Sequence, residues 1–262
     1  MKVKRMFKRQ YVVTSIILLI VFASLFVYNL DQNKKRDALY TEYISKASNN
    51  LGEDNISSAI TNLTEAIEIK PGEPKAYGGR AFVYFLNEQN DEALKDTEQV
   101  LSLSKGDTAH IYELRGQIFQ AKDDIKSAVE AYGLAYTASS SDRDYVHRYV
   151  VSLITDEQND KAYNVIKKYF IDTDKNVYWE DIDIWMDMGI SSIATHRCLE
   201  AGANAWHLLN RTEDGDERKD MAEAILSTAL NSKDCIDTGD TKMTSVESMK
   251  DAVANTESKI MK

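Results

Sequence analysis

Proline and glycine are scarce in this sequence, which has two prolines and eleven glycines in 262 residues. It also has no run in which valine, threonine and tyrosine alternate with polar residues. Strands and tight hairpin turns therefore have little material from which to form. Alanine, leucine, glutamate and lysine, which favour helices, are abundant by contrast. These features predict an all-α fold.

Cysteine is equally rare. Cys198 and Cys235 are the two cysteines of the chain, too few to define a disulfide scaffold. In an oxidising compartment they could form one disulfide with each other. Two buried free thiols are an equally good interpretation.

Beyond the amino terminus, basic residues are outnumbered by acidic residues. The chain has 42 Asp and Glu against 32 Lys and Arg, a net charge of −10, and five of the basic residues lie in the first ten. The remainder is strongly acidic and would repel the phosphate backbone that nucleic-acid-binding proteins must neutralise. We therefore expect no nucleic-acid partner.

The amino terminus differs from the rest of the chain. Residues 1–10 form a basic tail, and residues 11–30, "YVVTSIILLIVFASLFVYNL", carry no charge. A helix of that length rises about 30 Å, the thickness of a hydrocarbon core. A cleaved signal peptide is the alternative, but its apolar region is normally shorter and ends in small residues. The pattern predicts an uncleaved, single-pass transmembrane anchor at residues 11–30.

The charges flanking this run predict its orientation. More basic residues precede it than follow it, and positive charge tends to stay on the cytoplasmic side. We therefore expect a cell-membrane protein whose amino terminus is cytoplasmic. Residues 11–30 would lie in the lipid bilayer, and the bulk of the chain would lie outside the cytoplasm.

An alanine recurs at a fixed spacing through residues 38–170. Tyr43, Tyr77 and Tyr112 are each followed sixteen residues later by an alanine. The recurring alanines, separated by steps of 34, 35 and 34 residues, are Ala59, Ala93, Ala128 and Ala162. This period, with small residues where two helix backbones must approach, predicts pairs of antiparallel helices.

The stretches "AYGGRAFVYFLNEQNDEALKDTEQVLSL" and "YELRGQIFQAKDDIKSAVEAYGLAY" resemble the tetratricopeptide repeat family, a helix-turn-helix array. The resemblance covers residues 38–170 as about four units and implies a helical solenoid. Arg80 and Arg115 depart from the pattern, because the family favours leucine at these positions. The basic start, one anchor and a short array are similar to membrane-anchored proteins of bacterial envelopes.

Both prolines lie in "IEIKPGEPKAY", residues 67–77. We interpret this stretch as the joint between the first two units, with Pro71 ending one helix and Pro74 opening the next.

Beyond residue 170 the repeat signal weakens. Tyr178 with Ala194, and Trp206 with Ala222, keep the spacing of sixteen residues. We interpret residues 171–232 as two degenerate helical pairs. Residues 233–262 are polar and are expected to form a tail or a closing helix.

The family resemblance implies a concave binding groove lined by the first helix of each pair. Carried over to this sequence, the groove residues are Lys75, Phe82, Phe85, His110, Glu113, Gln117, Gln120, Asp144 and His147. Phe82 and Phe85 lie beside the core stripe of their helix, so they either face a partner or pack under the neighbouring repeat. The implied partner is a protein or peptide.

No residue pattern predicts catalysis. The four histidines lack the i, i+4 spacing of a helical zinc motif. Residues 172–183, "DTDKNVYWEDID", resemble a calcium loop but lack its glycine. The sequence has no glycine-rich phosphate loop and no nucleophile motif. We therefore predict no catalytic residues, no metal site and no cofactor.

Together these features predict a membrane-anchored interaction scaffold whose extracytoplasmic groove binds a protein or peptide, in envelope assembly or secretion. Two alternatives remain open: a self-associating structural subunit of an envelope complex, and an enzyme with a site in the carboxy-terminal helical region. The sequence indicates neither the partner nor the oligomeric state.

Overall fold

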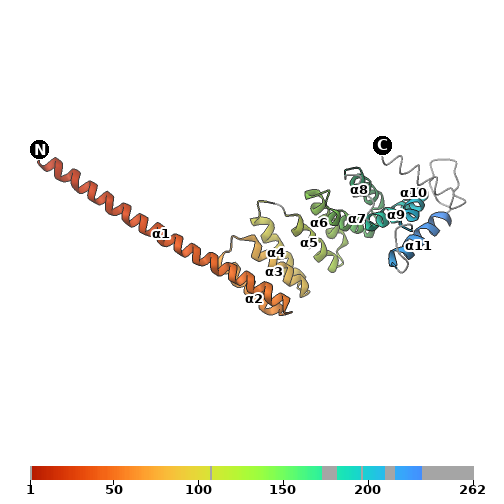
Figure 1. The fold of residues 1–262 in the computed structure, drawn as a ribbon, viewed down its shortest axis with the longest axis horizontal. Helices are drawn as coiled ribbons and strands as arrows, with labels where there is room; N and C mark the ends of the chain where they lie inside the picture. The colour runs from red at the N-terminus through yellow and green to blue at the C-terminus, as the bar shows by residue number, and fades with distance from the viewer. Residues whose placement is uncertain (1, 107, 173–181, 196, 210–215, 232–262) are drawn as a thin grey trace. The chain divides into compact units, whose positions relative to one another are not determined.

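The computed structural model describes residues 2–106, 108–172, 182–195, 197–209 and 216–231. These residues form helices and contain no strand (Figure 1), which confirms the all-α prediction. The chain divides into two compact units, residues 1–105 and 106–262. Unit 1 contains α1 (Lys2–Gly52), α2 (Ile56–Ile69), α3 (Pro74–Leu86) and α4 (Asn90–Leu103). Unit 2 contains α5 (Ala109–Ala121), α6 (Ile125–Ala138), α7 (Arg143–Thr155), α8 (Asn159–Asp172), α9 (Ile182–Ala194), α10 (Cys198–Leu209) and α11 (Glu217–Asn231).

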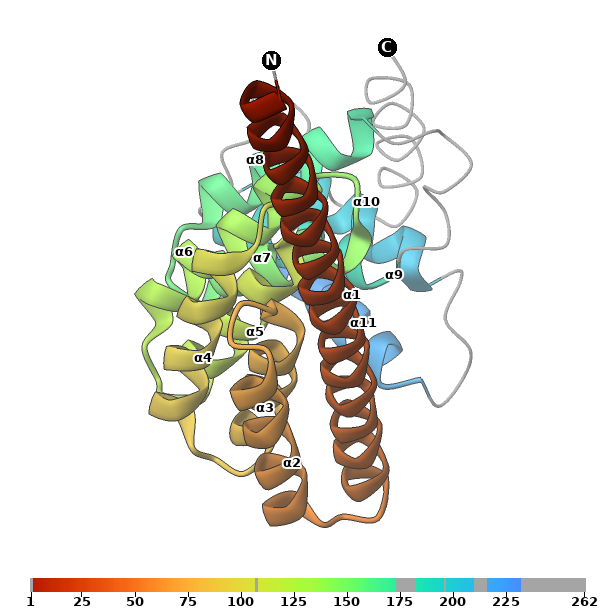
Figure 2. The same cartoon turned by 90° about the vertical axis from the view of Figure 1, so that its left-hand side faces the viewer.

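The predicted transmembrane helix at residues 11–30 is wrong. That stretch lies inside α1, which continues as one helix to Gly52 (Figure 2). Within the described part of the chain, no helix combines the length and apolar character that crossing a membrane requires. The predicted cell-membrane localisation is wrong for the same reason.

The carboxy-terminal part of α1 forms the first helix pair of unit 1 with α2. Ala47 of α1 and Leu63 of α2 are buried in one apolar cluster. Arg36 Nη2 of α1 donates a hydrogen bond of 2.6 Å to the carbonyl oxygen of Ile69, the last residue of α2. Because the last carbonyls of a helix have no partner inside it, this contact stabilises the end of α2.

The segment between α2 and α3 confirms the predicted joint. The backbone N–H of Lys70, which caps α2, donates to the carbonyl of Ala66. Pro74 is the first residue of α3, a position where a helix has no internal partner for a backbone N–H. Pro71 lies in the turn between the two helices.

The turns inside four helix pairs share one backbone conformation, in which a residue other than glycine occupies the left-handed position. In each turn one residue has a φ between 58° and 60°, and these residues are Asp54, Glu88, Asp123 and Glu157. The N–H of Glu88 donates to the carbonyl of Phe85 at 3.0 Å. The N–H of Gln89 reaches back to the carbonyl of Tyr84 at 2.9 Å. This pair of bonds is the Schellman ending of a helix, which usually places glycine at the left-handed position.

Burial of the recurring alanines confirms the predicted repeat register. At most 1% of each is exposed, and they are Ala59, Ala93, Ala128 and Ala162. Each lies on the second helix of its pair. The spacing read from the sequence therefore marks the close contact between paired helices.

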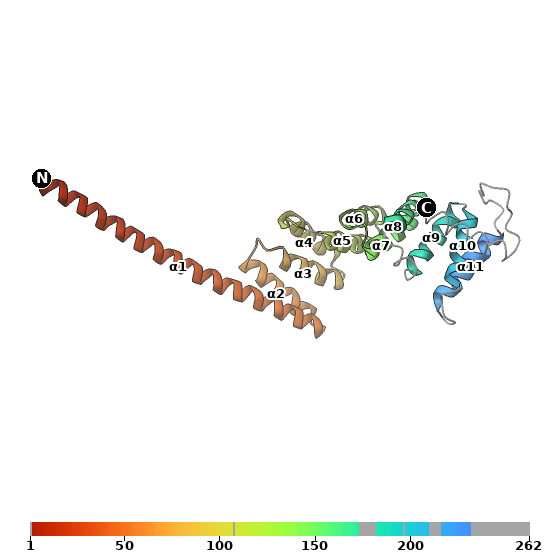
Figure 3. The same ribbon diagram turned by 45° about the horizontal axis from the view of Figure 1, so that its top comes forward.

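Unit 2 packs its helices around one extended apolar cluster. Gly116 of α5 lies against the ring of Tyr132 of α6, and a Cβ at Gly116 would approach the ring carbons to 2.6 Å. The missing side chain is what allows α5 and α6 to pack at this distance. Further along the chain, α9, α10 and α11 pack on one another (Figure 3).

Candidate functional site

The predicted binding residues of unit 1 lie on α3. Phe82 is 43% exposed, and Leu86, one helical turn further on, is 48% exposed. Lys75 is exposed near the start of the helix, whereas Phe85 is half-buried. Within unit 1, Phe82 therefore faces solvent and Phe85 is partly packed. Their role in partner binding stays a prediction.

Arg80, which departs from the family pattern, joins three helices of unit 1. Its Nε and Nη2 donate to the two carboxylate oxygens of Asp96 on α4, at 2.7 and 2.9 Å. Its Nη1 donates to the hydroxyl of Thr64 on α2 at 3.0 Å. The rings of Tyr77 and Tyr84 lie 5.9 and 5.7 Å from the guanidinium carbon. The spacing of these residues is visible in the sequence, because sixteen residues separate Thr64 from Arg80 and sixteen separate Arg80 from Asp96.

In unit 2 the structure brings several predicted residues together on α5. Gln117 Nε2 donates to Glu113 Oε1 at 3.3 Å. Gln120 Oε1 accepts a hydrogen bond of 3.0 Å from the hydroxyl of a buried tyrosine on α6. His110, at the start of α5, and Asp144, at the start of α7, are exposed.

Glu113 also connects α5 to α7. Its Oε1 lies 2.7 Å from Arg148 Nε, as an ion pair without the alignment of a hydrogen bond. Arg148 directly follows His147 on α7. The ion pair that Glu113 makes with α7 therefore involves the residue next to the predicted residue His147.

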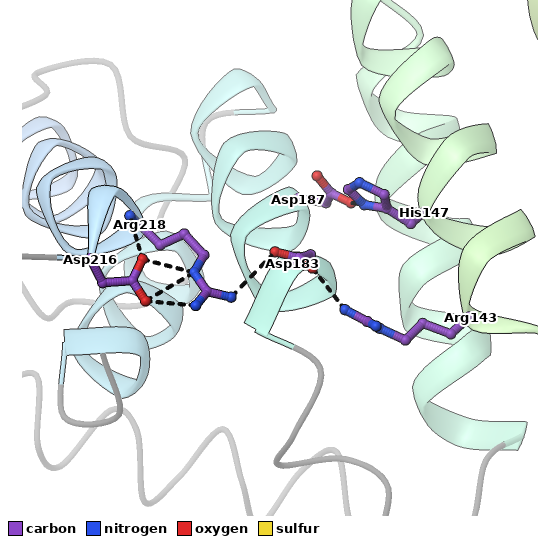
Figure 4. Close-up of polar contacts among 6 residues, drawn as sticks. All are labelled: Arg143, His147, Asp183, Asp187, Asp216 and Arg218. Atoms are coloured by element: carbon purple, nitrogen blue, oxygen red, sulfur yellow. Dashed lines mark hydrogen bonds and ion pairs between the residues drawn. The ribbon is translucent and has the colours of Figure 1, made fainter. Parts of the chain in front are cut away.

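Two parallel contacts connect α7 to α9 (Figure 4). Arg143 Nη2 donates to Asp183 Oδ2 at 2.7 Å, and His147 Nδ1 lies 2.7 Å from Asp187 Oδ2. Both pairs are separated by 40 residues, and both partners on each helix are one turn apart. Neither aspartate was predicted as a binding residue, because the separation of 40 residues departs from the period of 34 or 35 in the preceding repeats.

Arg218 extends the contacts to α11. Its guanidinium binds the Asp216 carboxylate, with Nη2 2.6 Å from Oδ2, and Nη1 lies 3.7 Å from Asp183 Oδ1. The hydrogen bonds from Arg218 lower the pKa of Asp216 to about 2. Figure 4 shows Asp183 between Arg143 and Arg218. We name this set the polar ladder; its members are Arg143, His147, Asp183, Asp187, Asp216 and Arg218.

One step of the polar ladder contains a buried carboxylate. Asp187 is 5% exposed, and loss of solvation raises its pKa. The hydrogen bond to Asp187 raises the pKa of His147, against the opposing effect of partial burial. Both shifts favour a proton in the contact between the imidazole and the carboxylate.

The described residues contain no group of three or more His, Cys, Asp or Glu placed to hold a metal ion. Cys198 is buried on α10, and Cys235 lies outside the described residues, so their pairing stays a prediction. The absence of catalysis also stays a prediction.

Solved structures show what the fold is similar to. A tetratricopeptide repeat protein from Parabacteroides merdae has a TM-score of 0.62 at 13% identity, over 73% of this chain and 73% of its own. YrrB, described as a TPR protein with an unusual peptide-binding site, has 0.56 at 16% identity, over 70% and 89%. PilF of Pseudomonas aeruginosa has 0.57 at 13% identity, over 86% and 92%.

No protein-family model and no curated protein matches the sequence. The chain has the tetratricopeptide-repeat fold, as its sequence resemblance predicted.

Proposed function

We propose that this chain is a protein-interaction scaffold that binds a segment of a partner protein on the first-helix face of unit 2. This face comprises the surface side chains of α5, α7 and α9, and its polar residues include Glu113, Gln117, Arg143, His147 and Asp183. The observation that supports it is the set of contacts joining these successive helices.

These contacts hold polar side chains in place before a partner arrives. Arg143 and His147 are each fixed by a carboxylate of α9, and Arg148 by Glu113. A preformed surface lowers the entropic cost of binding, because fewer side chains must be ordered in the complex. The similarity to YrrB, whose description names a peptide-binding site, supports the same kind of partner.

We propose no catalytic role for the chain. The expected envelope setting depended on the predicted transmembrane anchor, so it is not part of the proposed function.

Site-specific crosslinking tests the proposed surface. A photoreactive residue replaces Gln117 on α5 in one variant and Glu130, which is exposed on α6, in a control variant. After irradiation in cells that produce the protein, we expect a defined adduct at position 117 and none at position 130. The purified adduct partner should bind the wild-type chain, and Arg143→Ala should weaken that binding. Equal adducts at both positions, or none at position 117, would contradict the proposal.

A further inference from the structure

Within the polar ladder, the contact between His147 and Asp187 contains an imidazole, a group that can change charge near neutral pH. The neighbouring contact joins Arg143 and Asp183, and a guanidinium does not lose its proton in proteins. Imidazole, in contrast, changes charge near neutral pH. A change of pH therefore alters one of the two contacts between α7 and α9 and leaves the other unchanged.

The charged groups around His147 influence how tightly its imidazole holds a proton. From α9, Asp183 and Asp187 act on the ring, and from its own helix Arg143 does. Among the described residues, α6 and α8, which also pack on α7, supply none of the charges acting on it. With His147 protonated, these four groups sum to zero; with His147 neutral, they carry one negative charge.

The imidazole of His147 is also accessible to solvent. The side chain of His147 is 40% exposed, although Nδ1 faces the buried Asp187 carboxylate. The change of charge therefore takes place at the surface that the partner would contact. A cationic group brought to this surface is repelled by the imidazolium and attracted once the proton has left.

We propose that the His147–Asp187 pair makes binding at the first-helix face depend on pH, so that a lysine- or arginine-containing segment binds more tightly when His147 is neutral. The inference rests on the proposed function. By linkage, binding of such a segment releases a proton from the pair, whereas a glutamate-containing segment favours its retention. The overall charge of −10 acts in the same direction, because it favours a basic partner at any pH.

Two labelled synthetic peptides test the pH dependence with the full chain. They have the same length and differ in carrying lysine or glutamate at every third position. Fluorescence anisotropy is measured at about pH 5.5 and about pH 8, which bracket the ordinary imidazole pKa of about 6.5. We expect the lysine peptide to bind the wild type about three- to tenfold more tightly at the higher pH. In His147→Gln this dependence should be absent.

Lys126→Gln provides a matched control, because it also replaces a basic side chain, exposed on α6. Its pH dependence should equal that of the wild type. An unchanged pH dependence in His147→Gln, or tighter binding of the glutamate peptide at the higher pH, would overturn the inference and leave the proposed function intact. Failure of both peptides to bind at either pH would overturn the inference and count against the proposed function.

A second measurement remains informative if His147→Gln folds poorly. In Asp187→Asn the imidazole loses its anionic partner while the side chain keeps its shape. The NMR titration of the His147 ring should then move to lower pH than in the wild type. An unchanged titration would show that Asp187 does not control this proton and would overturn the inference.

Discussion

Arg80 and Asp96 form a bidentate ion pair inside unit 1, with Nε 2.7 Å from Oδ2 and Nη2 2.9 Å from Oδ1. Asp96 is 4% exposed, and Arg80 is held on its other side by Thr64. The family pattern favours leucine at the position of Arg80. This chain thus has a polar contact where an apolar one would be usual.

Removing one partner of this pair should be far more costly than replacing both. We expect Asp96→Ala to lower the free energy of unfolding by about 3–5 kcal/mol, because it leaves a buried guanidinium without its counter-charge. The double replacement Arg80→Leu and Asp96→Leu should come close to the wild type, since apolar residues carry no desolvation cost. Urea unfolding followed by circular dichroism measures both.

The exposed pair of Lys46 and Glu42, one helical turn apart on α1, serves as the control. Glu42→Ala should leave the free energy of unfolding nearly unchanged, because exposed ion pairs contribute little. If Asp96→Ala were as mild as Glu42→Ala, the buried ion pair would not stabilise unit 1.

Gly116→Ala should destabilise unit 2 by up to about 2 kcal/mol. The new Cβ would lie 2.6 Å from the ring of Tyr132, which is buried and has little room to move. Overpacking of this kind costs about 1–3 kcal/mol, and the roughly 1 kcal/mol that alanine gains over glycine in a helix offsets only part of a cost near the upper end of this range. Gly72→Ala, whose Cβ would meet nothing within 4 Å, should leave thermal unfolding nearly unchanged. A stabilised Gly116→Ala variant would contradict the close packing of α5 on α6.

Glu88→Gly should stabilise the turn between α3 and α4 by up to about 1 kcal/mol. Glu88 has a φ of 58°, a conformation that costs an L-residue about 1–2 kcal/mol and costs glycine almost nothing. Glu88→Val should destabilise, because a β-branched side chain is strained there. As the comparison, Lys95→Gly inside α4 should lose about 1 kcal/mol. Equal losses for both glycine variants in urea unfolding would argue against the left-handed turn.

Stability should fall as the pH rises above neutral. The pKa of His147 is raised above its ordinary value of about 6.5. Its contribution is therefore fully present below about pH 6.5 and is lost as the pH passes its pKa in the folded chain. Burial also raises the pKa of Asp187, so its contribution is fully present below the ordinary carboxyl pKa of about 3.9 and is lost as the pH passes its pKa in the folded chain.

Thermal unfolding between about pH 6 and about pH 9 measures the effect. The midpoint of the wild type should decrease by up to a few degrees more than that of His147→Gln. Parallel curves for the two proteins would show that the pair has no net effect on stability.

A disulfide between Cys198 and Cys235 would be visible chemically. If the two residues pair, alkylation of the unfolded, unreduced chain should modify neither, and mass spectrometry should show two added groups only after reduction. By the chain-entropy estimate the closed loop contributes roughly 3–4 kcal/mol. Reductant should then lower the unfolding midpoint of the wild type and leave that of Cys235→Ser unchanged. Modification of both thiols without reductant would establish the alternative of two free cysteines.

The repeat register could be predicted as far as α8, because buried alanines mark it directly. It failed in the fifth pair. The spacing of Tyr178 and Ala194 placed Ala194 on a second helix, but Ala194 ends α9 and is exposed. The buried small residue is Ala201 on α10, 39 residues after Ala162. A longer connection before α9 therefore shifts the register, and a fixed period cannot predict its length.

The same shift explains why only part of the candidate site could be predicted from the sequence. Glu113 and His147 lie in regular repeats, so their positions on the first helices followed from the family pattern. Asp183 and Asp187 lie beyond the longer connection, where the expected offset of 34 or 35 residues becomes 40. The ion pair between Arg80 and Asp96 was not predicted for another reason. The family pattern has leucine at the position of Arg80, so it predicts no charged partner for this residue.

The continuity of α1 has a geometric consequence for unit 1. No break separates the exposed stretch around Leu30 from the part that packs on α2. An α-helix turns by about 100° and rises about 1.5 Å with each residue. One residue inserted beside Lys34 would therefore rotate everything before it by about 100° around the axis, without disturbing the first helix pair. The direction in which the side chains around Leu30 face is therefore set by the number of helical residues between them and the first pair.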